Sequence, residues 1–252
     1  MFDLNGHVAL VTGGNGGIGL AFARGLVKSG ASVAIWARNK DKNEAALAEL
    51  RDLGGQAEAF VCDVTDEGQV NDAFAATVEH FGKVDSCFAN AGGAGFRSFL
   101  HETDNATWNA AVDLNVNSVV NTFRPVIAHL LERKAPGKLI VTSSIAALMG
   151  MPTASGYGAT KAAVTGLTRS LAVELGHNGI TANALLPGYV ESDLTAKTPQ
   201  AFKDSALRRA CLGRLGKVED MEGVAVFMAS RHSDFMTGHS LIMDGGHSIH
   251  PA

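Results

Sequence analysis

Seven apolar segments recur along the chain, and helical patterns fill the intervals between them. Most of these segments are continuous rather than alternating in polarity, which is typical of strands buried on both faces of a parallel sheet. The intervening segment "KDKNEAALAELRDLGG" carries apolar residues at i, i+3 and i+4 spacing and ends in glycine, as an amphipathic helix does. The predicted strands are residues 7–13, 32–37, 57–64, 84–92, 138–144, 180–188 and 240–246.

This alternation predicts one α/β domain over residues 1–252, built as a doubly wound sheet of seven parallel strands with helices on both faces. The segment 189–215 interrupts the alternation, because it carries charge and only a weak helical pattern. One interpretation makes it a mobile cover over a binding site, and the other an ordinary pair of surface helices.

Composition excludes several classes of partner. The net charge of −4, without clustered basic residues, argues against nucleic acid. The N-terminal segment does not have the pattern of a signal peptide, and no apolar run approaches the length of a membrane span. The three cysteines have no C-x-x-C spacing and the histidines no H-E-x-x-H spacing, so we expect no metal site. A cytoplasmic protein that binds no membrane is the interpretation these features favour.

Ligands of such sheets bind beyond the carboxyl ends of the strands, so the residues after each strand are the candidates. The first strand is followed by "TGGNGGIG", residues 12–19. A glycine-rich turn that leads into a helix brings backbone N–H groups close to a pyrophosphate. In a chain with 29 glycines a chance cluster is the competing interpretation.

Two further strand ends fit the same anionic ligand. Asp63 and Val64 stand at the carboxyl end of the third predicted strand, and "NAG" at 90–92 stands at the carboxyl end of the fourth. Asp63 could accept a hydrogen bond from an adenine amino group, and small residues at 91 and 92 let the backbone pass close to a ribose. The structural alternatives are a helix N-cap for Asp63 and a turn residue for Asn90.

Tyr157 and Lys161 stand four residues apart in a helical pattern. A phenol has a pKa of about 10, and a cation one helical turn away favours the phenolate. The pair therefore indicates proton transfer, although many helix surfaces carry such i,i+4 pairs.

Taken together, these motifs resemble the short-chain dehydrogenase/reductase family, in the type with T-G-x-x-x-G-x-G and Y-x-x-x-K motifs. The resemblance rests on "TGGNGGIG", "CDV", "NAG", "LNVNS", a serine thirteen residues before "YGATK", "LLPG" and "GHSLIMDGG", and it spans about residues 5–246. It implies a Rossmann-like, dinucleotide-binding catalytic domain. The implied activity is an NADP(H)- or NAD(H)-dependent interconversion of a secondary alcohol and a ketone.

The resemblance also assigns the catalytic residues. By position the family's catalytic set falls on Ser144, Tyr157, Lys161 and Asn115. Ser144 would bond the substrate oxygen, and Tyr157 would act as the general acid or base. Lys161 would lower the pKa of the phenol and hold the nicotinamide ribose, and Asn115 would position a relay water. The neighbouring Ser143 and Asn117 are the alternatives that the spacing has to exclude.

The cofactor residues implied by the resemblance are Gly13, Asn15, Gly17, Ile18, Gly19, Arg38, Asp63, Val64, Asn90, Ala91, Gly92, Tyr157, Lys161, Pro187, Gly188, Val190 and Ser192. NADP(H) is favoured, because Ala37 replaces the aspartate common in NAD-dependent members and Arg38 suits a 2′-phosphate. NAD(H) stays possible, because Gly16 stands where NADP-dependent members often carry a basic residue and Arg38 could instead stack on adenine.

The substrate is expected to contact Ser144 and a largely apolar wall made by Ala94, Phe96, Ala147, Met149, Met151 and Tyr189. Such a wall favours a neutral ketone or alcohol of medium size. Reduction of a 3-oxoacyl thioester is an alternative, weakened because Ala135 and Asn178 occupy positions where such reductases usually carry arginines. A sugar or polyol substrate also stays open.

Two alternatives concern the class of protein and its assembly. A non-catalytic, cofactor-sensing regulator of the same fold would have no use for the proton-transfer set, so we favour an enzyme. The apolar surface of the predicted helices at 104–133 and 155–177 favours the homotetramer common in the family. Burial of that surface within the monomer is the competing explanation.

Overall fold

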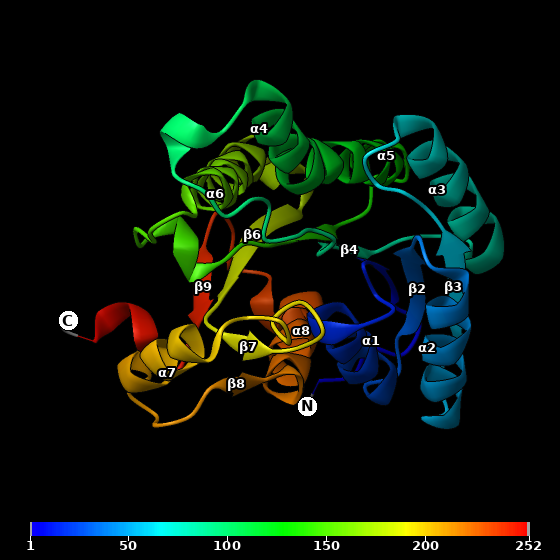
Figure 1. Cartoon of the computed structure of the whole chain (residues 1–252). Coiled ribbons are helices and arrows are strands. Elements are labelled where there is room, and N and C mark those ends of the chain that lie inside the picture. The colour runs from blue at the N-terminus through cyan, green and yellow to red at the C-terminus, as the bar shows by residue number, and fades with distance from the viewer. Residues whose placement is uncertain (1, 251–252) are drawn as a thin grey trace.

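A seven-stranded parallel sheet forms the centre of the molecule (Figure 1), a computed structural model that describes residues 2–250. The strand order is β3-β2-β1-β4-β5-β6-β9, and every neighbouring pair is parallel. The order reverses between β1 and β4, which is where ligands of doubly wound sheets bind. The strands are β1 (Val8–Thr12), β2 (Ser32–Ala37), β3 (Ala57–Val61), β4 (Ser86–Ala89), β5 (Gly137–Thr142), β6 (Ile180–Pro187) and β9 (Ser240–Met243).

Helices cover both faces of the sheet (Figure 1). One face packs against α1 (Gly17–Lys28), α2 (Lys40–Asp52) and α8 (Glu222–Ala229), and the other against α3 (Glu67–Phe81), α5 (Ser118–Glu132) and α6 (Ser155–Leu175). Two separate apolar cores result, one on each side of the strands. The predicted doubly wound sheet with helices on both faces is therefore confirmed.

The degree of burial along each strand follows its place in the sheet. Every residue of β1, β5 and β6 is buried, because helices cover both faces of these inner strands. The edge strands β3 and β9 are only partly buried, and Val61 at the end of β3 is 58% exposed. Several strands end earlier than the apolar pattern predicted, since residues such as Asn90 belong to the loops of the carboxyl edge.

The long helix predicted over 104–133 is not continuous. It consists of α4 (Asn105–Val112), a π-helical turn (Asp113–Asn117) and α5. A π-helical turn inserts a residue into the helical repeat and is frequent at functional sites. Here the turn holds Asn115, whose side-chain amide donates to the Ala111 carbonyl oxygen at 3.2 Å.

The segment 189–215 contains a strand and a helix of its own. β7 (Val190–Glu191) pairs in parallel with β8 (Gly216–Lys217), and α7 (Gln200–Arg209) lies between them in the sequence. The small β7–β8 pair was not predicted, because two-residue strands leave no readable pattern. In Figure 1 this yellow-to-orange part lies beside the carboxyl edge of the main sheet.

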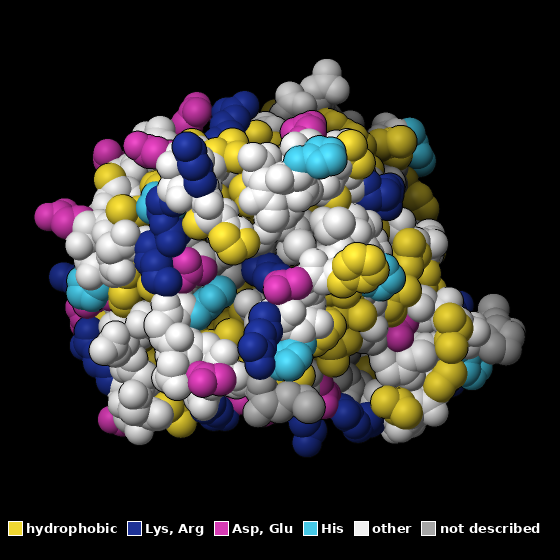
Figure 2. Space-filling view, turned by 180° about the vertical axis from the view of Figure 1, so that it is seen from behind, with side chains coloured by type: hydrophobic (Ala, Val, Ile, Leu, Met, Phe, Trp, Pro, Cys, Tyr) yellow, Lys and Arg dark blue, Asp and Glu magenta, His cyan; other side chains and the backbone are white. Residues whose placement is uncertain are grey.

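Charges of both signs are interspersed on the face turned away in Figure 1 (Figure 2). No described helix is both long and apolar enough to cross a membrane.

The contact between α1 and α8 provides a test of the packing. A Cβ atom at Gly25 would lie 2.5 Å from the backbone oxygen of Glu222, whereas a Cβ atom at Gly223 would meet nothing within 4 Å. We expect Gly25→Ala to destabilise the protein by about 1–3 kcal/mol and to lower Tm by about 2–10 °C, because the backbone of α8 must move. Gly223→Ala is the matched control and should be neutral or stabilising by up to about 1 kcal/mol. Equal Tm values for the two variants in thermal unfolding would contradict this packing.

Candidate active site

A cavity of about 800 Å³ lies at the carboxyl edge of the sheet, bounded by loops after β1, β2, β4, β5 and β6 and by the segment 189–215. It brings together most residues that the sequence analysis singled out. Those on its lining are Gly13, Asn15, Gly17, Ile18, Arg38, Asp63, Val64, Asn90, Ala91, Gly92, Ala94, Ser144, Met149, Met151, Tyr157, Lys161, Pro187, Gly188, Tyr189, Val190 and Ser192. Gly19, Phe96, Asn115 and Ala147 lie outside this lining.

Asn90 fixes the geometry at the centre of the cavity. Its backbone N–H donates to the Thr12 hydroxyl at 3.0 Å, and its side-chain amide donates to the Thr12 carbonyl oxygen at 3.1 Å. Its side-chain oxygen accepts from the Thr142 hydroxyl at 3.1 Å. Asn90 thus joins the carboxyl ends of β1, β4 and β5, which goes beyond the role of a simple turn residue.

The glycine-rich turn presents the start of α1 to the cavity. Gly13 and Gly17 have φ of +64° and +52°, a region that favours glycine. Gly16, the N-cap residue, provides no side-chain cap, so the first N–H groups of α1 are available to a ligand in the cavity. Gly19 lies behind the turn, where a Cβ atom would come within 2.2 Å of the Gly13 carbonyl oxygen. Gly19 therefore serves close packing of the turn rather than the cavity wall.

Ser144 and Tyr157 both line the cavity, and the Ser144 hydroxyl is close enough to the phenol to lower the pKa of Tyr157 in part. The hydroxyl of the neighbouring Ser143 is buried and donates to the Lys161 carbonyl oxygen at 2.8 Å. The structure thus separates two adjacent serines by function: Ser143 anchors α6, and Ser144 faces the phenol.

Lys161 is buried beneath the cavity floor. Its ammonium donates to the Thr142 carbonyl oxygen at 2.9 Å and lies 5.7 Å from the centre of the Tyr157 ring. Burial lowers the pKa of Lys161 to about 8. The side chain therefore stays mostly protonated at physiological pH, but it releases its proton far more readily than an exposed lysine.

The protonation of Tyr157 differs from the expectation. Burial raises the pKa of the phenol, and the Ser144 hydrogen bond and the positive charge of Arg97 oppose this rise only in part. The sequence analysis attributed a lowered pKa to Lys161. In the structure the ammonium is bonded to the Thr142 carbonyl, and Arg97 is the cation that acts on the phenol.

Asn115 lies directly behind the cavity wall. It is almost completely buried, and its side-chain oxygen accepts from the Gly93 N–H at 3.0 Å. A Cβ atom at Gly92 would lie 2.8 Å from that oxygen and 3.4 Å from the Lys161 nitrogen, so glycine is required at 92 for this close approach. Asn117, the alternative, is bonded to Asp113 at an exposed site.

The adenine end expected after β2 and β3 contains two ion pairs. Arg38 lies 3.7 Å from the Asp63 carboxylate, and Lys42 donates to Asp193 at 3.0 Å. The N-cap of α3 is Asp66, so the alternative role of Asp63 as that cap is excluded. Lys42 also lines the cavity, although the sequence analysis did not single it out. Its signal was the run of three basic residues Arg38, Lys40 and Lys42 directly after β2.

The wall around Ser144 contains basic groups besides the predicted apolar ones. Arg97, Arg209 and His247 line the cavity together with Met149 and Met151, so the predicted apolar wall was incomplete. They come from the loop after β4, from α7 and from the 3-10 turn at 247–249. Such separate segments give no common signal in the sequence.

Phe96 and Ala147, both predicted to contact substrate, are used elsewhere. A Cβ atom at Gly156 would lie 2.5 Å from the Phe96 ring, which also packs 6.4 Å from the Trp108 ring. Ala147 packs against the core between the sheet and α6.

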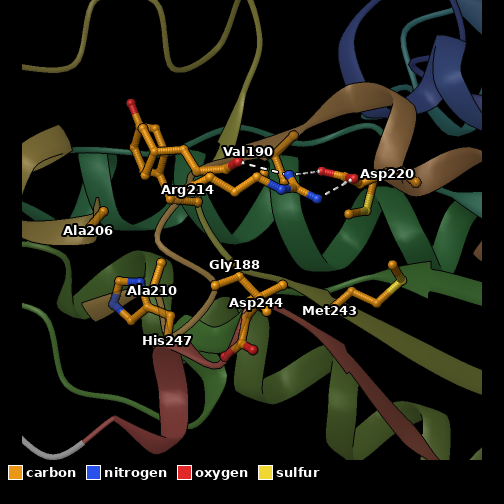
Figure 3. Close-up of a pocket in the computed structure, with 15 residues that line it drawn as sticks. Gly188, Val190, Ala206, Ala210, Arg214, Asp220, Met243, Asp244 and His247 are labelled. Carbon is orange, nitrogen blue, oxygen red and sulfur yellow. Dashed lines mark hydrogen bonds and ion pairs between the residues drawn. The ribbon is translucent and has the colours of Figure 1, made fainter. Parts of the chain in front are cut away.

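A second cavity, of about 160 Å³, lies on the other side of the wall formed by Gly188, Tyr189, Val190, Ala206 and His247 (Figure 3). Arg214 points to Asp220 there and donates two hydrogen bonds to its carboxylate, at 2.6 and 2.8 Å. Among residues 2–250, no group of three or more His, Cys, Asp or Glu side chains is arranged to hold a metal ion.

Sequence comparison finds relatives over the whole length of the chain. A family model described as Enoyl-(Acyl carrier protein) reductase matches residues 13–248. Gluconate 5-dehydrogenase from Gluconobacter oxydans is 36% identical, with 99% of this chain and 97% of the relative covered. The 3-oxoacyl-[acyl-carrier-protein] reductase FabG from Chlamydia pneumoniae is 33% identical, with 96% of this chain and 97% of the relative covered.

Solved structures agree with this result. A short-chain type dehydrogenase/reductase from Mycobacterium marinum superposes with a TM-score of 0.95 at 31% identity, covering 98% of both chains. The chain belongs to the short-chain dehydrogenase/reductase family. A gluconate 5-dehydrogenase from Burkholderia cenocepacia in complex with NADP and tartrate superposes with a TM-score of 0.92 at 36% identity, covering 98% of this chain and 97% of that chain. A 7α-hydroxysteroid dehydrogenase complexed with NADH superposes with a TM-score of 0.93 at 30% identity, covering 97% of this chain and 95% of that chain.

The buried Lys161 gives a pH-dependent prediction. In the folded protein it releases its proton near pH 8, whereas the unfolded chain keeps that proton up to about pH 10.5. Between these values the unfolded state binds more protons, so wild-type stability should rise relative to Lys161→Met by up to about 3 kcal/mol. Below pH 8 the cost of the buried charge is fully present, and the difference between the two proteins should be constant.

Urea unfolding of both proteins at several pH values from 7 to 10.5 measures this difference. Lys197→Met, which alters an exposed lysine, is the control and should show a stability difference that does not vary with pH. If the stability difference between the wild type and Lys161→Met also stayed constant with pH, burial of the ammonium would not destabilise the folded protein.

Proposed function

We propose that this family member is an NADP(H)- or NAD(H)-dependent oxidoreductase that interconverts a secondary alcohol and a ketone, with Tyr157 as general acid/base. The observation that carries the proposal is that the Ser144 hydroxyl, the Tyr157 phenol and the Lys161 ammonium converge on one cavity, with the ammonium 5.7 Å from the centre of the phenol ring. They share this cavity with the uncapped N-terminus of α1. One end of the cavity thus offers an anion site and the other a proton-transfer site.

The residues present fit a nicotinamide dinucleotide. Gly13, Gly17 and the start of α1 would hold the pyrophosphate, and Asp63 with Val64 would contact the adenine. The cavity wall at 90–92 and the Lys161 ammonium would contact the nicotinamide ribose, because glycine at 92 leaves room for the backbone to approach closely. When bound, the cofactor would supply or accept the hydride, as nicotinamides do.

The protein groups would handle the proton and the substrate oxygen. Ser144 would donate a hydrogen bond to the carbonyl oxygen, and Tyr157 would protonate that oxygen as hydride reaches the carbonyl carbon. The raised pKa of Tyr157 suits the role of acid, and Arg97 and Ser144 limit the rise. Asn115 lies behind Gly92 and Lys161, where its side chain would support a water relay.

NADP(H) is favoured over NAD(H) because two basic side chains line the predicted adenine end. Arg38 and Lys42 face Asp63 and Asp193, and a 2′-phosphate would bring two further negative charges to this cluster. The similar structures include complexes with NADP and with NADH, so both cofactors occur among the neighbours.

Reduction of a 3-oxoacyl thioester is the second candidate, favoured by the name of the Chlamydia pneumoniae relative and by the family model. Ala135 and Asn178 at the two expected arginine positions argue against it. A cofactor-sensing regulator would give no reason for Ser144, Tyr157 and Lys161 to converge on the cavity.

Assembly into a homotetramer and cytoplasmic localisation stay predictions. Two apolar side chains of the helices expected at the subunit contacts support the tetramer: Val173 of α6 is 79% exposed and Leu131 of α5 is 39% exposed.

The catalytic assignment is tested with paired substitutions. Tyr157→Phe and Ser144→Ala should each lower kcat at least about 100-fold, because they remove the acid and its substrate-oxygen partner. Cofactor affinity should stay within about 3-fold, since neither change removes a charge. Ser143→Ala is the matched control, which should lower Tm by loosening α6 while keeping most of kcat. Substantial turnover by Tyr157→Phe in a nicotinamide absorbance assay would refute the mechanism.

Cofactor preference is tested at the adenine end. Arg38→Gln and Lys42→Gln should each raise KM for NADPH about 10- to 100-fold and leave KM for NADH within about 3-fold, because each removes one phosphate partner. Lys40→Gln, an exposed neighbour outside the cavity lining, is the control and should change neither value. A wild-type enzyme that prefers NADH would disprove the NADP(H) assignment.

A further inference from the structure

Three basic side chains line the catalytic cavity away from the predicted adenine end. Arg97 and Arg209 are exposed to the cavity, and His247 is half-buried beside them. Within residues 2–250, neither arginine has a carboxylate within ion-pair distance, so both positive charges are uncompensated. Burial lowers the pKa of the His247 ring, the Asp244 carboxylate opposes this change, and the positive charge of Arg209 adds to it, so Arg209 and Asp244 both lie near that ring.

The acidic residues of the cavity lie elsewhere. Its two carboxylates, Asp63 and Asp193, face Arg38 and Lys42. Ser192, next to Asp193, packs against Gly17, which places this pair at the glycine-rich turn. Arg97 therefore brings a positive charge without a carboxylate partner among residues 2–250 close to Tyr157, in a protein whose net charge is −4. An uncompensated local charge of this kind attracts anions.

The neighbouring small cavity provides a comparison within the same molecule. Arg214 lines that cavity, and it donates two hydrogen bonds to the Asp220 carboxylate and a third to the Leu215 carbonyl oxygen (Figure 3). The positive charge of Arg214 is therefore neutralised by a carboxylate of the same chain. Arg97 and Arg209 carry no such partner among the described residues.

Packing holds Arg97 in place without using its hydrogen-bond donors. The guanidinium carbon lies 5.6 Å from the centre of the Phe202 ring, and the Phe202 ring lies 5.9 Å from that of Tyr189. All three side chains line the cavity. Stacking uses the face of a guanidinium and leaves the N–H groups at its edge free to bind a carboxylate in bidentate fashion. The positive charge also reaches the Tyr157 phenol, so a group bound to Arg97 would lie near the reacting centre.

We propose that the substrate is an oxo acid, or the corresponding hydroxy acid, whose carboxylate is bound by Arg97. This inference rests on the proposed function, because it places the reacting C–O group at Ser144 and Tyr157. In the reductive direction the carbonyl carbon gains hydride from NAD(P)H, the carbonyl oxygen gains the Tyr157 proton, and the carboxylate is unchanged. The predicted neutral substrate is replaced by an acid, whose carbon chain would contact Met149 and Met151.

The test compares oxo acids with their methyl esters as matched neutral probes. Straight-chain oxo acids with the keto group two to four carbons from the carboxylate, and the same compounds as methyl esters, are assayed with NADPH and NADH. Wild-type kcat/KM should be at least about 10-fold higher for the best acid than for its ester, because a hydrogen bond to a charged group is strong. Arg97→Gln should lower kcat/KM for the acid about 10- to 100-fold and for the ester less than about 3-fold.

Arg208→Gln is the matched control, because Arg208 is an exposed arginine of α7 outside the cavity lining. It should change neither kcat/KM value, which separates the effect of Arg97 from that of the protein's overall charge. An equal loss for acid and ester in Arg97→Gln would overturn the proposal, since it would mean that Arg97 acts only on Tyr157 or on folding.

Binding measured by calorimetry separates this inference from the proposed function. With the protein saturated by oxidised cofactor, the acids should bind at least about 10-fold more tightly than the esters, and Arg97→Gln should abolish this preference. Acids that bind through Arg97 without any change in nicotinamide absorbance would support the anion site and reject the reaction. Esters that bind or react as well as the acids in the wild type would reject the anion site, whatever the activity.

Discussion

Asn90 makes the hydrogen bonds on which the geometry of the site depends. It joins Thr12 at the end of β1 to Thr142 at the end of β5, and the Thr142 carbonyl oxygen in turn holds the Lys161 ammonium. The glycine-rich turn packs directly against the Asn90 side chain: a Cβ atom placed at Gly13 would lie 3.2 Å from the Asn90 amide nitrogen. One partly buried polar residue therefore links the proposed cofactor end of the cavity to its proposed proton-transfer end. Such hydrogen-bond networks are rigid, because a polar group left without its hydrogen-bond partner raises the free energy of the folded state in a low-dielectric interior.

The proposed catalytic end contains side chains whose burial is unfavourable for stability. Lys161 is buried with a single protein hydrogen bond to its ammonium, and Tyr157 is buried enough that its phenol resists ionisation. Burial of an ionisable group without a partner of opposite charge is unfavourable, and it persists where function requires it. The π-helical turn that carries Asn115 adds a second irregularity at the same place. The stable part of the molecule is the pair of apolar cores on either side of the sheet.

The segment 189–215 contacts both ends of the cavity. Asp193 reaches Lys42 at the predicted adenine end, while Phe202 supports Arg97 near the reacting groups. The first contact joins residues 151 positions apart in the sequence. Because one segment contacts the groups expected to bind cofactor and those expected to bind substrate, its position is coupled to both. The charged side chains of the cavity form ion pairs at the predicted adenine end, where Arg38 and Lys42 face carboxylates. Arg97 and Arg209 have no carboxylate partner among residues 2–250.

The sequence by itself determined the sheet, because continuous apolar segments between helical patterns have few other solutions, and it placed Ser144, Tyr157 and Lys161 at strand and helix positions that converge. It could not resolve what depends on contacts between distant segments. The direction of the Tyr157 pKa, the inward position of Arg97 and the packing of Phe96 away from the cavity all follow from loops meeting in space. The π-helical turn also left no pattern, since its single extra residue does not change the apolar periodicity. Tertiary structure decided these features because burial and charge act through space, whereas periodicity acts along the chain.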